Sequence, residues 1–326
     1  MASPQSWPYV SVIVPMYNEA ERIEGLLAAL VRQTYPQDSF EVIVVDSGSA
    51  DDTLGRCQRF RALPLRIAEE TKIQGPDAAR NRGLAIARGK IIAFTDADCR
   101  PDPTWLAEGV SAMLAEAADL VGGSVRFISG VAPSFAEVYD SINFLQQEHS
   151  VANRGMAFTA NLFVRHEIFA RIGGFPVLPG WNGDAAFTAK ATGEGCRLIY
   201  AAAAVVSHPA RGYRELATKV WRIGFGQGLS GPLAVDGNSH QQRLKSSLGA
   251  SFRKPHFAHL WPPSLIRSLK SRRVGWDARA TLILWCLSVT VILIGGIAFL
   301  KGRWLRLISD GPRILKFVSP DYRRPQ

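Results

Sequence analysis

The sequence predicts an α/β fold with a mostly parallel central sheet, and three features of the chain indicate it. Short apolar runs of strand length alternate with segments of helical periodicity four times before residue 115. Acidic or polar residues follow several of these runs, at the place where open α/β sheets bind their ligands. With 47% hydrophobic residues among 326, the chain can also bury a full core.

The first part of the chain is expected to hold four strand–helix units. Asn18 is a candidate cap for the first helix, and Pro103 suits the first turn of the fourth. Right-handed crossovers between such units give a parallel sheet. The strands are expected at 10–15, 40–45, 63–67 and 91–94, and the helices at 21–31, from 51 onward, 75–87 and 103–114.

The second part of the chain continues with less regular alternation. Gly173 and Gly174 end one of its short helices, and a loop rich in Pro, Gly and Trp follows. Strands are expected at 120–125, 158–164, 197–200 and 204–207, and helices at 133–147, 165–172 and 184–192.

Two carboxylates leave the strand at 91–94 with one residue between them. Side chains alternate along a strand, so Asp96 and Asp98 are expected to point to the same side at its exit. Two acids without a neutralising base suit a divalent cation that holds a phosphate-bearing ligand. An Asp-x-Asp pair also arises by chance about once in a chain of this length, so its position at a strand end carries the argument.

The loops after three strands should meet at one edge of the sheet, because parallel strands carry their carboxyl ends on the same side. This places Glu19, Asp46, Asp96 and Asp98 near one another. A dinucleotide-binding Gly-x-Gly-x-x-Gly is missing from the first loop, which reads Pro15-Met16-Tyr17-Asn18-Glu19. A phosphate-binding Gly-x-x-x-x-Gly-Lys-Ser/Thr motif is missing as well.

The charge and cysteine content limit the partners of the protein. The formal charge of +10 is concentrated after about residue 210, which favours an anionic membrane surface and not nucleic acid. The four cysteines show no Cys-x-x-Cys spacing, so reduced thiols in the cytosol are expected. The first residues lack a charged and an apolar region, so no signal peptide is expected.

Six short motifs, in this order and spacing, resemble the family 2 glycosyltransferases, whose catalytic domain has the nucleotide-sugar-binding GT-A fold. The resemblance covers about residues 9–210. The motifs are Val12 to Glu19, Val44 to Asp51, Ala79 to Gly83, Asp96 to Asp98, Gly173 to Phe175, and Gly183-Asp184 followed by Phe187.

The resemblance implies a role for each matching residue. Pro15, Tyr17, Glu19 and Asp46 would hold the nucleobase and ribose, with Asp46 accepting a hydrogen bond from a uracil-like imide, which favours a UDP-sugar. Arg80 would lie near the nucleotide, with a solvated helix face as the alternative. Asp96 would contact the nucleotide sugar and Asp98 a Mn²⁺ or Mg²⁺ ion bridging the diphosphate.

The same resemblance implies the catalytic base. Asp184 matches the residue that takes the proton from the acceptor hydroxyl, although Gly183 replaces the first of the two acids usual there. An N-cap role is the alternative for Asp184. His208 matches a position that completes the metal shell in some relatives, with a surface histidine as the alternative. One base and one metal imply a single displacement that inverts the anomeric centre.

The C-terminal part predicts a membrane helix. Residues 281–300 carry no charge and are long enough to span a bilayer, with a buried core helix or an in-plane insertion as alternatives. Basic residues on both sides leave the orientation open. The segment Lys219-Val220-Trp221-Arg222 does not match the Gln-x-x-Arg-Trp of processive relatives, so one sugar per encounter is expected.

The predicted organisation has four parts, and the predicted activity has two rivals. A catalytic domain spans 1–210, a basic and aromatic connector 211–279, a membrane helix 280–300 and a basic tail 301–326. The protein would move one sugar from a nucleotide sugar to a lipid-linked or polysaccharide-precursor acceptor at the cytoplasmic face of the inner membrane. A sugar nucleotidyltransferase or a catalytically idle membrane scaffold are the alternatives.

Overall fold

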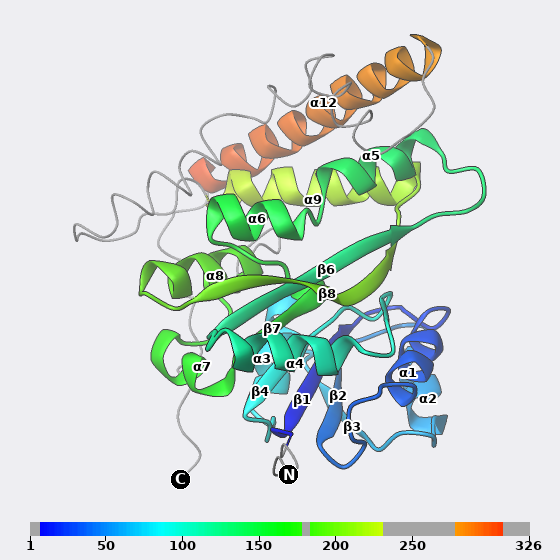
Figure 1. Cartoon of the computed structure of the whole chain (residues 1–326). Helices are drawn as coiled ribbons and strands as arrows, with labels where there is room; N and C mark the ends of the chain where they lie inside the picture. The colour runs from blue at the N-terminus through cyan, green and yellow to red at the C-terminus, as the bar shows by residue number, and fades with distance from the viewer. Residues whose placement is uncertain (1–6, 178–182, 231–277, 309–326) are drawn as a thin grey trace.

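The computed structural model describes residues 7–177, 183–230 and 278–308 (Figure 1). The strands are β1 Val10–Met16, β2 Phe40–Asp46, β3 Leu65–Glu69, β4 Ile91–Phe94, β5 Arg100–Pro101, β6 Leu120–Ile128, β7 Leu162–Arg165 and β8 Leu198–Pro209. The helices are α1 Ile23–Val31, α2 Thr53–Arg59, α3 Pro76–Leu84, α4 Trp105–Ala115, α5 Phe135–Asn143, α6 Gln147–Arg154, α7 His166–Ile172, α8 Gly183–Gly193, α9 Tyr213–Ser230 and α12 Ala278–Ile308, with a 3₁₀ turn at Thr159–Asn161.

The N-terminal half is the predicted set of strand–helix units. β1 pairs in parallel with β2 and β4, and β2 pairs in parallel with β3. The strands are rich in β-branched residues and buried on both faces, which explains their nearly continuous apolar runs. Val12 and Val14 face one core layer, and Ile13 with Val45 face the other. The carboxyl ends of β1, β2 and β4 therefore meet at one edge.

The sheet as a whole is mixed, which corrects the expectation of a mostly parallel sheet. Its order is β3-β2-β1-β4-β7-β6-β8-β5. β7 is antiparallel to both β4 and β6, and β5 is antiparallel to β8. The periodicity of an apolar run does not reveal the direction of the strand, so these pairings could not be read from the sequence.

Several element boundaries differ from the expected ones, and in three places the elements themselves differ. The helix expected over 133–147 is two helices, because Leu145 adopts a left-handed conformation with φ of 50° between α5 and α6. The strands expected at 197–200 and 204–207 are one strand, β8, which pairs with β6 through an irregularity between Gly123 and Ser124. The strand expected at 158–164 begins with the 3₁₀ turn.

A third, smaller core lies between α5, α9 and α12, which lie together above the sheet (Figure 1). Leu216 and Val220 of α9 are buried there, and Leu287, Val291 and Ile294 of α12 pack against them. A Cβ atom on Gly224 would collide with the Gly295 carbonyl oxygen, so glycine is what lets the two helices approach at that point.

The structure does not support the transmembrane helix predicted over 280–300. Among residues 7–177, 183–230 and 278–308, no helix combines the length and apolarity that crossing a bilayer requires. The apolar stretch belongs instead to the longer helix α12, which also contains Lys301 and Arg303. One face of α12 is used to pack against the protein's own helices. Most of the predicted connector and tail, at 231–277 and 309–326, falls outside the described residues.

Four phenylalanines form a cluster around Phe175. Phe175 lies with its ring centroid 5.1 Å from that of Phe94, 5.9 Å from that of Phe169 and 4.8 Å from that of Phe187. Asn81 holds the backbone of Phe175 as well, donating to its carbonyl at 2.8 Å and accepting from its N–H at 2.8 Å. These contacts anchor the backbone at Phe175 to the sheet and to α3.

Replacing Phe175 with alanine is expected to destabilise the fold strongly, because it opens a cavity in the middle of this aromatic cluster. The expected loss is about 3–5 kcal/mol of unfolding free energy, measured by urea denaturation. Val131→Ala, at a fully exposed loop position, is the control and should change the unfolding free energy very little. A similar loss in both variants would contradict the assigned role of the cluster.

Candidate active site

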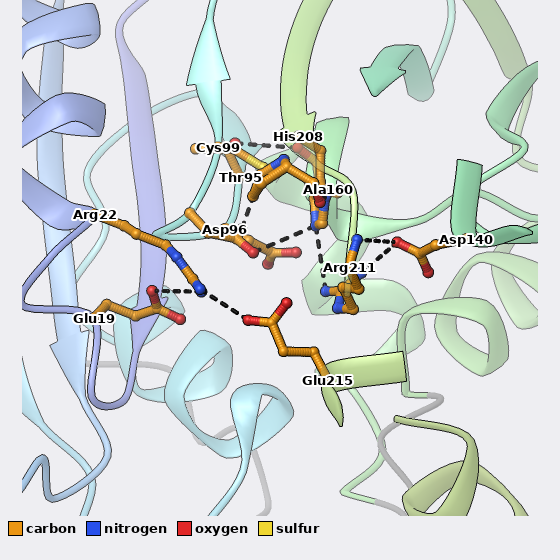
Figure 2. A network of polar contacts seen from close by, with 12 residues as sticks. Glu19, Arg22, Thr95, Asp96, Cys99, Asp140, Ala160, His208, Arg211 and Glu215 are labelled. Atoms are coloured by element: carbon orange, nitrogen blue, oxygen red, sulfur yellow. Dashed lines mark hydrogen bonds and ion pairs between the residues drawn. The ribbon is translucent and has the colours of Figure 1, made fainter. Parts of the chain in front are cut away.

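Four potential metal ligands converge at the end of β4. Asp96, Asp98, Cys99 and His208 each offer a ligand atom, and these atoms all lie within 4.8 Å of one another. Figure 2 shows three of them, Asp96, Cys99 and His208. The short strand β5 brings them together, because Arg100 pairs with Ser207 in the antiparallel ladder between β5 and β8. His208 is fully buried, so the alternative of a surface histidine is wrong.

The hydrogen bonds of His208 indicate which of its nitrogens could bind a metal. Nδ1 lies 2.7 Å from the Pro209 carbonyl oxygen, which can only accept, so Nδ1 carries the proton. Nε2 accepts from Arg211 Nη2 at 3.3 Å, and it lies 3.5 Å from Asp98 Oδ2. Arg211 brings a positive charge to the place where a lone pair and a carboxylate oxygen meet, and a divalent cation held by Nε2 and Asp98 would supply the same charge. The donor set of two carboxylates and an imidazole therefore fits Mn²⁺ or Mg²⁺.

Glu19 adds negative charge to the same region. Burial, together with the nearby carboxylate of Asp98, raises the pKa of Glu19 to about 7. Its nearest cation is Arg22, with 3.5 Å between Glu19 Oε2 and Arg22 Nη1. Three carboxyl groups from two loops thus crowd one edge of the sheet, as the sequence predicts for Glu19, Asp96 and Asp98.

Asp184 lies in the first turn of α8, one residue inside the helix start and not at the N-cap. Its Oδ1 accepts from the N–H of Ala185 at 2.7 Å, and its Oδ2 accepts from the N–H and hydroxyl of Thr159 at 3.3 and 3.4 Å. Burial raises the pKa of Asp184 above its ordinary value. A carboxylate with a raised pKa is the stronger base.

A buried guanidinium joins the metal side of the site to the side of Asp184. Arg80 donates to Asp77 Oδ1 from Nη1 at 3.0 Å and to Asp96 Oδ1 from Nη2 at 3.0 Å. Asp77 accepts at its other oxygen from the N–H of Gly183, the first residue of α8, at 3.1 Å. Arg80 is only 6% exposed, so the alternative of a solvated helix face is wrong.

The single acid at the start of α8 has a steric explanation. A Cβ atom on Gly183 would lie 2.5 Å from Asp77 Cγ and 2.5 Å from the Pro176 carbonyl oxygen. The place of a preceding acidic side chain is thus taken by Asp77, whose pKa burial raises to about 6. Asp77 was not identified from the sequence, although its i,i+3 spacing to Arg80 on a helix is a signal that could have indicated it.

The remaining predicted residues form the neighbouring loops. Asp46 is buried and uses both carboxylate oxygens on its own turn, accepting from the N–H of Gly48 and Ser49 at 3.0 Å each and from the Ser49 hydroxyl at 2.5 Å. Ser49 in turn accepts from the N–H of Asn18 at 2.9 Å, which ties this loop to the first one. Tyr17 is half exposed, and Pro15 is buried within β1.

Several residues of the site carry no signal in the sequence. Cys99 joins the potential metal ligands through its position alone, and Arg211 reaches His208 from the segment before α9 (Figure 2). Asp140 is fully buried on α5 and pairs with Arg211 and Lys219. These residues come from elements far apart in the chain, so only the folded structure identifies them.

The fold and the site define a glycosyltransferase. The chain belongs to glycosyl transferase family 2, whose family model matches residues 11–177. The α/β, GT-A-like fold that the sequence motifs imply is thereby confirmed. Its sheet is curled and mixed. Homologues in this family indicate glycosyl transfer from a nucleotide sugar, which favours the predicted transferase over the nucleotidyltransferase.

Among its curated relatives is the glycosyltransferase AglE of Haloferax volcanii. It is 43% identical over 222 residues, which cover 68% of this chain and 73% of the relative. A second relative is named dodecaprenyl-phosphate galacturonate synthase and comes from Rhizobium johnstonii. It is 36% identical over 121 residues, which cover 35% of each chain.

A solved structure of similar fold is the mannosyltransferase PcManGT from Pyrobaculum calidifontis, in complex with GDP-Man and Mn²⁺. It superimposes with a TM-score of 0.61 at 25% sequence identity, and the match covers 94% of this chain and 89% of that one. That relative therefore holds a nucleotide sugar and a divalent ion on the fold that this chain shares.

The crowding of carboxyl groups predicts how stability depends on pH in the metal-free protein. The folded state favours neutral Glu19. The stability that protonated Glu19 contributes to the fold is therefore complete below about pH 4.5, and it is lost as the pH rises through about 7. Glu19→Gln stays neutral, and we expect it to raise the melting temperature at pH 8 by about 2 °C or more. At pH 5 the variant and the wild type should melt alike.

The matched control is Glu24→Gln, which removes an exposed carboxylate one turn away on α1. It should shift the melting temperature by less than Glu19→Gln at pH 8. Equal shifts at both pH values for Glu19→Gln would show that the raised pKa does not govern this region.

Proposed function

We propose that the protein is a metal-dependent, inverting glycosyltransferase that transfers one sugar from a UDP-sugar to a lipid-linked or polysaccharide-precursor acceptor. The observation that carries the proposal is the convergence of Asp96, Asp98 and His208 with Asp184, joined through Arg80. A divalent ion on one side and a buried base on the other are the parts that a single displacement at the anomeric carbon requires.

The first two loops are the proposed nucleoside site. Pro15, Tyr17, Glu19 and Asp46 lie at the carboxyl ends of β1 and β2, where α/β sheets bind nucleotides. The half-exposed ring of Tyr17 is available for stacking on a base. Asp46 supports this site by holding the 46–49 turn, and its remaining lone pairs can accept from the base.

Asp98 and His208 are the proposed metal ligands, and Asp96 is proposed to contact the nucleotide sugar. When bound, the ion neutralises charge on the diphosphate of the leaving nucleotide. Arg80 holds one oxygen of Asp96 in place, and Asp98 faces the unprotonated nitrogen of His208. These side chains are therefore oriented before any ligand arrives.

Asp184 is proposed to accept the proton of the acceptor hydroxyl. As that proton moves to the carboxylate, the acceptor oxygen forms a bond to the anomeric carbon and the bond from that carbon to the diphosphate oxygen breaks. The Thr159 and Ala185 N–H groups fix the carboxylate, so it keeps its direction during the transfer. The new bond forms opposite the bond that breaks, so the product has inverted configuration.

The acceptor is proposed to reside at the cytoplasmic face of the plasma membrane. One side of α12 presents exposed apolar residues at helical spacing, namely Leu293, Ile297, Leu300 and Trp304. The exposed cations Lys301 and Arg303 lie beside them and complement anionic headgroups. An in-plane helix of this kind binds the interface without spanning it. The name of the relative from Rhizobium johnstonii, which includes dodecaprenyl phosphate, is consistent with a lipid-linked acceptor.

Single transfer, not polymer extrusion, is proposed from the sequence of α9. This helix carries Trp221 before Arg222, in place of the Gln-x-x-Arg-Trp order of processive relatives.

Asp184→Asn is expected to lower sugar transfer by at least about a thousandfold, because the amide keeps the shape of the side chain but cannot take a proton. Binding of UDP with Mn²⁺, measured by thermal shift, should stay near the wild-type value. Asp98→Ala should lose transfer and also the Mn²⁺-dependent part of the thermal shift. The control Glu24→Gln should retain both activity and binding. Wild-type turnover in Asp184→Asn would refute the assigned base.

Vesicle binding tests the role of α12. The full chain should co-sediment with vesicles that contain phosphatidylglycerol and bind less to phosphatidylcholine alone. Leu293→Ser combined with Ile297→Ser should weaken this binding by about tenfold or more, because each apolar side chain contributes on the order of 1–2 kcal/mol at the interface. Unchanged vesicle binding in the double variant would show that the exposed face of α12 does not bind the membrane. If the wild type instead forms a concentration-dependent dimer that the double variant does not form, the face binds a second copy of the chain.

A further inference from the structure

Arg211 lies on the coordinating side of a proposed metal ligand. Its Nη2 is 3.3 Å from Nε2 of His208 (Figure 2). Nε2 accepts this hydrogen bond, because the ring proton is on Nδ1, which donates to the Pro209 carbonyl oxygen at 2.7 Å. A divalent ion would use the same lone pair of Nε2, and one lone pair cannot serve both partners. Arg211 and a metal ion are therefore alternative partners of His208.

The imidazole ring of His208 is not free to turn away from Arg211. The side chain is fully buried, and its Nδ1 is held by the Pro209 carbonyl. The ring of Phe127 packs against it in a T-shaped contact, with 5.6 Å between the ring centroids. Close packing of this kind keeps a side chain in one orientation. The arginine is thus the group that has to move when an ion binds to Nε2.

The contacts of Arg211 suit such a movement. Its backbone N–H donates to Asp140 Oδ2 at 3.1 Å, which fixes the start of the side chain. The guanidinium is held less firmly, because Nη1 lies 3.5 Å from the same oxygen and has no hydrogen-bond partner among the described residues, although it is buried. Asp140 also keeps Lys219, at 3.1 Å from its Oδ1, when the guanidinium leaves. The side chain can therefore turn about a fixed backbone.

The diphosphate of a nucleotide sugar is the anion that can receive the guanidinium. In the proposed function the ion at Asp98 and His208 holds this diphosphate, so its oxygens come next to the atoms that Arg211 contacts. A guanidinium binds phosphate oxygens through parallel charge-assisted hydrogen bonds. Such bonds would give Nη1 the partner that no described residue provides, and a buried donor without a partner costs free energy.

We propose that Arg211 couples the binding of the metal ion to the binding of the sugar donor. Without the donor, its guanidinium holds Nε2 of His208 and competes with divalent ions. With the donor, it moves to the diphosphate and leaves Nε2 to the ion. The inference rests on the proposed metal-dependent transfer and adds an order of binding to it. The ion binds tightly only together with the donor, because a competing partner lowers the apparent affinity of the site.

The test uses one substitution with two expected effects of opposite sign. Arg211→Met removes the charge and every donor of the side chain. It should tighten the binding of Mn²⁺ to the nucleotide-free chain by about tenfold, measured from the signal of free Mn²⁺ in electron paramagnetic resonance, because the competing hydrogen bond is lost. The same variant should bind UDP in EDTA about tenfold more weakly by calorimetry, because the diphosphate loses its guanidinium. General damage to the site would weaken both.

A conservative variant and a matched control separate this contact from general charge effects. Arg211→Lys keeps the charge with a single donor group, so both affinities should fall between those of the wild type and Arg211→Met, and it serves as the test if Arg211→Met does not fold. Arg214→Gln removes an exposed arginine three residues further along and should change neither affinity. Equal tightening of Mn²⁺ binding in Arg214→Gln would overturn the competition.

The outcomes also separate this inference from the proposed function. If the wild type binds Mn²⁺ and UDP but Arg211→Met binds Mn²⁺ no more tightly, or if the wild type in EDTA binds UDP no better than Arg211→Met, the coupling is wrong and the proposed transfer stands. If the wild type binds neither Mn²⁺ nor any nucleoside diphosphate, the proposed function and the coupling fail together.

Discussion

The geometry of the site depends on one buried arginine. Arg80 donates to Asp77 and Asp96, and through Asp77 it is linked to the first residue of α8. A guanidinium taken out of water is costly unless its charge is matched, and removing one partner of such a group usually costs about 3–5 kcal/mol. The two carboxylates are therefore held to Arg80, and the metal side and the base side keep one fixed spacing.

That constraint accounts for several otherwise separate features. Gly183 has no side chain because Asp77 occupies the space beside it. Asp96 is turned toward Arg80, which leaves Asp98 to face His208. The backbone of Phe175 is held by Asn81, from the same helix that carries Arg80 and Asp77. Helix α3 thus orders both ends of the site, although no residue of it is proposed to take part in the reaction itself.

The C-terminal elements add a second layer to this arrangement. α9 and α12 share a core with α5, and Lys219 of α9 pairs with the buried Asp140 of α5. The outward face of α12 keeps large apolar side chains in solvent, among them Leu300 and Trp304, each more than 60% exposed.

The sequence alone determined the α/β class, the strand–helix units of the first half and the edge where Glu19, Asp96 and Asp98 meet. Local periodicity and strand-end position carry that information, since they depend on residues close together in the chain. The antiparallel strand β7, the burial of Arg80, the Asp77 link and the convergence of Cys99 and His208 were decided by the tertiary structure. The fate of residues 281–300 was decided there too, because apolarity marks what is buried but not whether protein or lipid covers it. Contacts between distant segments depend on strand direction and on long-range packing, and neither leaves a periodic signal in the sequence.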